Sequence, residues 1–111
     1  MTLHDDLVAA KALIDSPSKW TKGAFRTSAG CYCAYGAVIY SLPQDDDYSA
    51  RELDAADTLQ AALPSRFSTL SISMFNDRRA TTHADIMALF DRAIAAASPN
   101  RIVTGSEGGG V

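Results

Sequence analysis

Apolar positions along the chain recur mostly at helical spacing. The first segment carries four apolar residues at intervals of four, three and four, which places them on one helix face: Leu3, Leu7, Ala10 and Ile14. Thr2 precedes this run, and Asp5 follows three residues later, as in a capping box. Because a proline disfavours helix at the residue before it, Pro17 ends the segment.

Two further helices are predicted in the middle of the chain. The apolar run from Cys33 to Leu42 predicts one helix, which the following proline stops. Ser49 followed by Glu52 has the spacing of a capping box and predicts the start of the next helix. Its buried face is expected to contain Leu53, Ala56, Leu59 and Leu63. Asp54 and Asp57 are expected to lie on its solvent-facing side.

The segment from 67 to 76 fits two periods. Leu70, Ile72 and Met74 alternate as in a strand. Phe67, Leu70 and Met74 also fit helical turns, so we favour a short helix ending near Asn76 and leave the strand open. Asn76 and Asp77 are then expected to form a turn.

The last helix has the most regular pattern of the chain. Its apolar residues recur on one face over three turns: Ile86, Leu89, Phe90, Ala93, Ile94 and Ala97. Thr82 is the expected cap, with Asp85 at the reciprocal position, and Pro99 ends the helix. Residues 101–111 are expected to form a flexible tail, because "TGSEGGGV" offers nothing apolar to bury.

These elements predict an all-α protein, a compact bundle of about four main helices. Residues 1–100 are expected to form a single domain, which suits a chain of 111 residues. Residues 20–30 predict either a small hairpin or an irregular loop. Trp20, the only tryptophan, is expected to fold back over the core.

Charge and composition narrow the function classes. A net charge of −3 argues against general nucleic-acid binding, which usually needs a basic face. The N-terminus lacks the pattern of a signal peptide, and no apolar run approaches the roughly 20 residues of a membrane span. Two cysteines are too few for a disulfide framework, so we expect reduced thiols and a cytoplasmic location.

Four short blocks stand out along the chain: "WTKGA" from Trp20, "CAYGA" from Cys33, the Ile72–Asp77 stretch, and the amphipathic helix that Thr82 opens. Together they resemble an uncharacterised family of small bacterial and phage-encoded proteins. This chain has Phe75 where the family commonly has tryptophan, and "RRATT" where a Pro-Gly-Arg-Thr type of turn is common. The resemblance implies a small helical domain and brings no catalytic residues or cofactor.

Cys31 and Cys33 are the first candidates for chemistry. Residues two apart on a helix point about 200° apart, and the two histidines lack paired spacing, so we expect no metal site. Cys33 at a helix N-terminus would favour the thiolate, with His83 as its base and Asn76 or Asp77 orienting the base. The alternative is that Cys33 packs as a small buried residue and His83 is an exposed surface residue.

The second candidate is the loop "NDRRATTHAD". Arg78, Arg79, Thr81 and Thr82 lie beside a predicted helix N-terminus, where free backbone N–H groups favour an anion. Trp20 is counted with them as a ligand-contact candidate. The alternative is a solvated loop whose threonine only caps the helix.

No complete catalytic set is visible, so the favoured function is a non-enzymatic interaction or regulatory module without a cofactor. It would bind a protein partner or a small anionic ligand. The alternative is a small thiol-dependent enzyme that uses Cys33 with His83.

Overall fold

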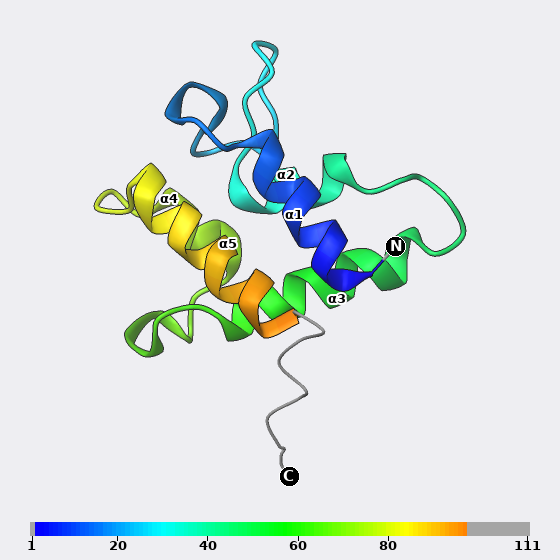
Figure 1. The fold of residues 1–111 in the computed structure, drawn as a ribbon. Coiled ribbons are helices and arrows are strands. Elements are labelled where there is room, and N and C mark those ends of the chain that lie inside the picture. The colour runs from blue at the N-terminus through cyan, green and yellow to red at the C-terminus, as the bar shows by residue number, and fades with distance from the viewer. Residues whose placement is uncertain (1, 98–111) are drawn as a thin grey trace, which may run out of the picture.

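The computed structural model describes residues 2–97, and within them the all-α prediction is confirmed. Figure 1 shows α1 packing against its neighbours near the centre of the molecule, and it contacts α2, α3 and α5. The α-helices are α1 (Leu3–Leu13), α2 (Ala34–Ser41), α3 (Tyr48–Ala61), α4 (Ile72–Asp77) and α5 (His83–Ala97). Two 3₁₀ turns, η1 (Pro17–Lys19) and η2 (Ser65–Phe67), lie in the connections.

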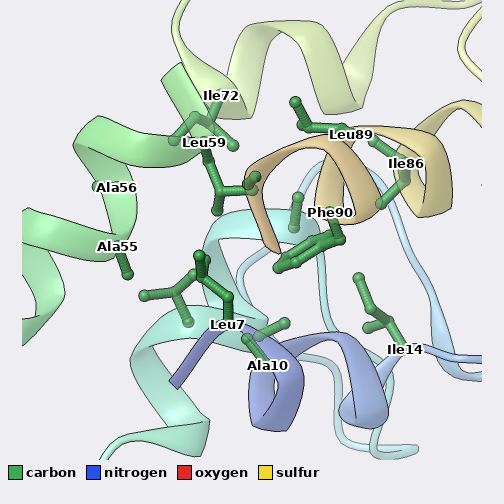
Figure 2. Close-up of a cluster of buried hydrophobic side chains, with 14 of the residues drawn as sticks. Leu7, Ala10, Ile14, Ala55, Ala56, Leu59, Ile72, Ile86, Leu89 and Phe90 are labelled. Atoms are coloured by element: carbon green, nitrogen blue, oxygen red, sulfur yellow. The ribbon is translucent and has the colours of Figure 1, made fainter. Parts of the chain in front are cut away.

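The core forms where the apolar faces of the helices meet (Figure 2). Phe90 of α5 is the largest of the fully buried side chains. The other fully buried apolar side chains of larger size are Leu7, Ile14, Val38, Leu59, Ile86 and Leu89. The apolar faces predicted for the first and last helices therefore pack against each other, as their periodicity requires.

Capping boxes begin both of these helices, as predicted. The Thr2 hydroxyl accepts from the Asp5 N–H at 3.2 Å, and the Asp5 carboxylate accepts from the Thr2 N–H at 3.2 Å. The Thr82 hydroxyl and the Asp85 carboxylate make the same pair of bonds at the start of α5. These caps form because all their partners lie within three residues of one another.

The capping box predicted at Ser49 is wrong. Helix α3 begins one residue earlier, at Tyr48, and no side chain caps it. The Glu52 carboxylate instead accepts a hydrogen bond of 2.6 Å from the Tyr35 hydroxyl of α2. Leu53, predicted to be buried, is 60% exposed, because the core face of α3 runs through Ala55, Ala56 and Leu59.

The segment from 65 to 77 is helical, and the strand alternative is wrong. The η2 turn is followed by α4, which the Ser71 side chain caps by accepting from the Met74 N–H at 3.1 Å. Asn76 and Asp77 are the last residues of α4 and do not form the separate turn that was expected.

Residues 20–32 form an irregular loop. Within the described chain only isolated bridges occur here, joining Tyr32 to Trp20 and to Arg26, so the hairpin alternative is not realised. Gly23 and Gly30 have φ values of 82° and 84°, in the left-handed region that favours glycine. The loop folds back so that the Cys33 N–H donates to the Phe25 carbonyl at 3.3 Å, which fixes the entry into α2.

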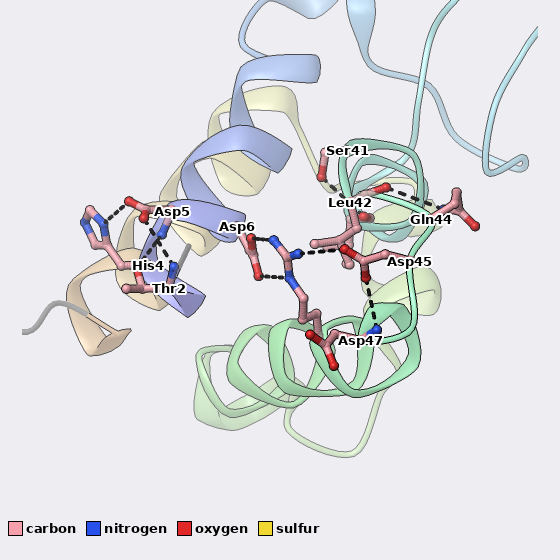
Figure 3. A network of polar contacts seen from close by, with 11 residues as sticks. Thr2, His4, Asp5, Asp6, Ser41, Leu42, Gln44, Asp45 and Asp47 are labelled. Atoms are coloured by element: carbon pink, nitrogen blue, oxygen red, sulfur yellow. Dashed lines mark hydrogen bonds and ion pairs between the residues drawn. The ribbon is translucent and has the colours of Figure 1, made fainter.

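One buried ion pair joins α1 to α3. Asp6 is only 5% exposed, and Figure 3 shows its carboxylate pointing from α1 toward α3. The Arg51 guanidinium donates to it in a fork, from Nε at 3.1 Å and from Nη2 at 2.5 Å. Asp45 of the α2–α3 connection lies 3.8 Å from the same guanidinium. Nothing in the hydrophobic pattern of α1 indicated that Asp6 would be buried.

The prediction that Pro99 ends the last helix and that a flexible tail follows concerns residues outside the described part of the chain. In residues 2–97 no helix has the length and apolar character required to cross a membrane.

Candidate functional site

Asn76, at the end of α4, ties three segments together. Its side chain is fully buried. Its Oδ1 accepts from the Trp20 indole at 2.7 Å and from the Ala34 N–H at 3.0 Å. Its Nδ2 donates to the Thr21 carbonyl at 3.1 Å. The buried amide therefore holds the 20–32 loop and the N-terminus of α2 against α4, and we call this network the Asn76 junction.

Asp77 and Lys22 extend the junction to the surface. Asp77 Oδ1 accepts from the Asn76 amide and from the Gly23 N–H, each at 2.9 Å. Lys22 Nζ donates to the Arg78 carbonyl at 2.6 Å and lies 5.5 Å from the centre of the Trp20 ring. The sequence blocks around Trp20, Cys33 and Asn76 thus meet at one place, although they are separated by dozens of residues.

Trp20 is positioned by this network and by the core. Its ring is half-buried and packs against the hydrophobic cluster, so it does fold back over the core. Because its indole N–H donates to Asn76, its polar edge is already used inside the protein. Its expected contact with a ligand stays a prediction.

Gly36 allows the loop to approach α2 closely. A Cβ atom at this position would lie 1.9 Å from the Phe25 carbonyl oxygen, far inside any real contact distance. Glycine is therefore required at position 36 by the close approach of the 20–32 loop backbone.

Cys33 caps α2, as its predicted place at a helix N-terminus allows. Its Sγ accepts from the Gly36 N–H at 3.2 Å, and the residue is 3% exposed. Burial raises the pKa of the Cys33 thiol above its ordinary value of 9.0, and the hydrogen bond from the Gly36 N–H only partly opposes this. The thiol is therefore protonated at neutral pH, which disfavours a nucleophilic role.

His83 does not meet Cys33. Its Nε2 lies 2.7 Å from the Ile14 carbonyl, and its ring centroid is 6.0 Å from that of Trp20. In residues 2–97 no hydrogen bond joins the His83 ring to the Cys33 thiol. The residue is half-buried between α1 and the loop, so the expected surface position is wrong. The two thiol-enzyme candidates are thus held by separate partners.

Of the loop residues predicted to bind an anion, the structure joins Arg78 to Thr81 by a hydrogen bond, while Thr82 and Arg79 lie in other environments. Thr82 caps α5, and Thr81 is 3% exposed. Arg78 donates from Nη1 to the Thr81 hydroxyl at 3.1 Å, and its guanidinium lies 4.0 Å from the centre of the Phe67 ring. Arg79 is exposed to solvent. Of this set, Arg78 lines a cavity next to α4.

That cavity has a volume of about 170 Å³ and lies between η2, α4 and α5. Three arginines line it: Arg66 on η2, Arg78 after α4 and Arg92 on α5. Phe67 and Phe75 form part of its wall, with ring centroids 5.5 Å apart. We call it the arginine cavity.

The charge of the arginine cavity is opposite to that of the whole protein. Asp85 is the single carboxylate among its lining residues, and its Oδ2 accepts from the Thr82 N–H at 2.9 Å. None of the three guanidinium groups forms an ion pair within residues 2–97. Arg92 donates from Nε to the Ala62 carbonyl at 2.9 Å, and this bond fixes its position. The cavity can therefore accept negative charge.

Sequence reasoning found one of these three arginines. Arg92 lies seven residues after Asp85, two helical turns along α5, so its place on the same face as Asp85 was detectable. Arg66 carried no such signal, because the η2 turn that positions it depends on packing against α4.

Comparison with known proteins supports the resemblance to an uncharacterised family; the bacterial or phage origin expected from it stays a prediction. No curated protein and no solved structure gives a significant match to the chain. A family model, by contrast, matches residues 1–96, which includes all the helices apart from the last residue of α5. The chain therefore belongs to DUF6197, a family of unknown function.

Proposed function

We propose that the protein is a non-enzymatic module that binds a small anionic ligand in the arginine cavity. The sequence left two partner classes open, a protein or a small anion, and the arginine cavity favours the anion. The observation that carries the proposal is that three arginines and a single carboxylate line one cavity.

The chemistry of the lining supports a charge-assisted contact. Guanidinium groups are planar donors that match the oxygens of phosphate and carboxylate groups. Arg78 is already oriented, because its guanidinium is held by the Phe67 ring and by the Thr81 hydroxyl. Arg66 lies over the same ring, at 4.8 Å from its centre. A ligand would therefore meet two arginines whose side chains are partly ordered before it binds, which lowers the entropic cost of binding.

The size of the cavity limits the ligand. Its volume of about 170 Å³ is below the roughly 300–1,000 Å³ of pockets that enclose drug-sized molecules. A compact anion such as inorganic phosphate or a small carboxylate suits it, and a whole nucleotide would leave most of its surface outside.

The test is a titration of the full chain with inorganic phosphate and with acetate, followed by melting temperature and by backbone amide signals. Phosphate is expected to raise the melting temperature and to shift the amides of residues 78–92. Added chloride should weaken the effect through screening. Arg66→Ala should weaken binding about tenfold, the effect of losing one charge-assisted hydrogen bond.

Arg79→Ala is the matched control, because Arg79 is exposed and adjacent in sequence but does not border the cavity. It is expected to leave phosphate binding unchanged. Equal losses of phosphate affinity in Arg66→Ala and Arg79→Ala would mean that phosphate is attracted by the general surface charge and not by the cavity. An absence of any shift in the unmodified protein would refute the proposal.

A further inference from the structure

A second cavity, of about 280 Å³, lies between the 20–32 loop, the N-terminus of α2 and α4. It is bordered by Gly23, Ala24 and Phe25 of the loop, by Cys33, and by Ser73 and Asp77 of α4. It shares no lining residue with the arginine cavity. We call it the Asp77 cavity.

Asp77 is the ionised group of this cavity. The Cys33 thiol, the other titratable lining group, is buried. Asp77 Oδ1 accepts from the Gly23 N–H and the Asn76 amide, and these bonds hold the carboxylate in place. No hydrogen bond to Asp77 Oδ2 and no ion pair to the carboxylate occurs within residues 2–97.

The cations that adjoin the lining residues in sequence are directed elsewhere. Arg78, which follows Asp77, donates to the Thr81 hydroxyl and lies over the Phe67 ring. Lys22 precedes Gly23, yet its ammonium group donates to the Arg78 and Arg79 carbonyls and lies against the Trp20 ring. The negative charge of Asp77 is therefore fixed in position, borders a cavity and is left without a cationic partner in the described chain. Such a charge favours a cationic ligand.

The remaining lining groups define which kind of cation fits. Ser73 brings a hydroxyl, which accepts hydrogen bonds, to the same cavity as the carboxylate. Phe25, half-exposed, contributes an aromatic residue to the border, and aromatic rings attract ammonium groups. A single carboxylate suits a metal ion poorly, because divalent cations such as Ca²⁺ take six or more oxygen ligands. In residues 2–97 no three metal-ligating side chains gather in one place.

We propose that the Asp77 cavity is a second ligand site, which binds a small molecule through a primary ammonium group. The ammonium donates to Asp77 Oδ2 and to the Ser73 hydroxyl, and the organic body of the ligand lies against Phe25. The volume of about 280 Å³ suits a short aliphatic or single-ring amine.

The test uses propylammonium and benzylammonium chloride as probes and 1-propanol as the neutral counterpart. Binding to the full chain is followed by the backbone amide signals of Gly23, Ser73 and Asp77. Both amines are expected to shift these signals in a saturable way, and propanol is not. Equal binding of propanol and propylammonium would overturn the proposal, and so would the absence of any shift with the amines.

Asp77→Asn is the main variant, because an asparagine keeps an Oδ1 acceptor for the Gly23 N–H while it removes the charge. It is expected to weaken amine binding about tenfold or more. Asp54→Asn is the matched control, since Asp54 is exposed on α3 and borders none of these cavities. An equal loss of binding in both variants would refute a defined site.

Ser73→Ala keeps the test decisive if Asp77→Asn does not fold. It removes the hydroxyl without touching the Asn76 junction, and it is expected to weaken amine binding several-fold. The assignment is overturned if Ser73→Ala binds the amines as tightly as the unmodified protein and Asp77→Asn, where it folds, does so too. Neither Ser73 nor Asp77 lines the arginine cavity, so both variants are expected to bind phosphate as the unmodified protein does. The two proposals can therefore be refuted independently.

Discussion

Replacing Asn76 by alanine tests whether one buried amide holds the loop, α2 and α4 together. The side chain is fully buried and makes four hydrogen bonds. Alanine removes all four. It leaves the buried Ala34 N–H without its acceptor and the Thr21 carbonyl without its donor.

The magnitude follows from the cost of unsatisfied groups. Each buried polar group that loses its partner costs about 1–3 kcal/mol, whereas an intact bond contributes only about 1 kcal/mol net. One partner deprived in the interior and three that are partly buried give an expected loss of about 3–5 kcal/mol for Asn76→Ala. Because domains of this size are stable by only about 5–15 kcal/mol, the variant should be close to the limit of folding.

Trp20→Phe gives a milder probe of the same junction. It removes the indole N–H but leaves Asn76 Oδ1 bonded to Ala34. A double-mutant cycle between the two substitutions isolates their coupling, which we expect to be about 0.5–1.5 kcal/mol. Gln60→Ala is the control, because its amide donates to the Ser68 and Leu70 carbonyls from a half-exposed position where water can replace it.

The assay is urea denaturation followed by tryptophan fluorescence for the Asn76 and Gln60 variants, and by circular dichroism for all of them. A loss below about 1 kcal/mol in Asn76→Ala, or a loss no larger than that of Gln60→Ala, would refute the reasoning. It would mean that water or a local rearrangement satisfies the junction without the amide.

Four other outcomes are expected from the structure. Gly36→Ala should lower the free energy of unfolding by about 1–3 kcal/mol despite alanine's helix preference, because its Cβ would meet the Phe25 carbonyl; a neutral result in urea denaturation would contradict that contact. Phe90→Ala should cost about 3–5 kcal/mol in the same assay, and under 1 kcal/mol would mean that the α5 face is not buried. Asp6→Ala removes one partner of the buried ion pair and should lower the free energy of unfolding by about 3–5 kcal/mol. A loss under about 1 kcal/mol, as for an exposed pair, would contradict its burial. The hydrogen bond to Glu52 raises the pKa of Tyr35 to about 12. Its contribution to the free energy of unfolding should therefore be complete below the ordinary pKa of 10.0 and disappear as the pH rises through 12. Alkaline denaturation curves of the same shape for the unmodified protein and for Tyr35→Phe would refute this.

Local signals in the sequence determined the first and last helices. Thr2 and Thr82 cap them with partners three residues away, so the bonds form wherever the helix forms. The apolar stripe of α5 has one buried face in the structure, as its spacing of three and four residues requires. These features needed no knowledge of the rest of the chain.

The start and face of α3 were decided by tertiary contacts. The spacing of Ser49 and Glu52 predicts a cap, but Glu52 is held by the Tyr35 hydroxyl of α2. Leu53 lies outside because the ion pair between Asp6 and Arg51 helps to fix which side of α3 meets α1. A pattern within one helix cannot reveal the charge on its neighbour.

The candidate sites depended most on the tertiary structure. The sequence singled out Trp20, Cys33 and Asn76 separately, but Asn76 bonds to Trp20 across 56 positions and to Ala34 across 42. Arg66 and Arg92 join Arg78 only because η2 and α5 pack beside the end of α4. Helices can be predicted from the sequence because the residues that cap and pattern them lie within four positions of one another. A cavity is lined by side chains that only folding brings together, so the sequence does not reveal it.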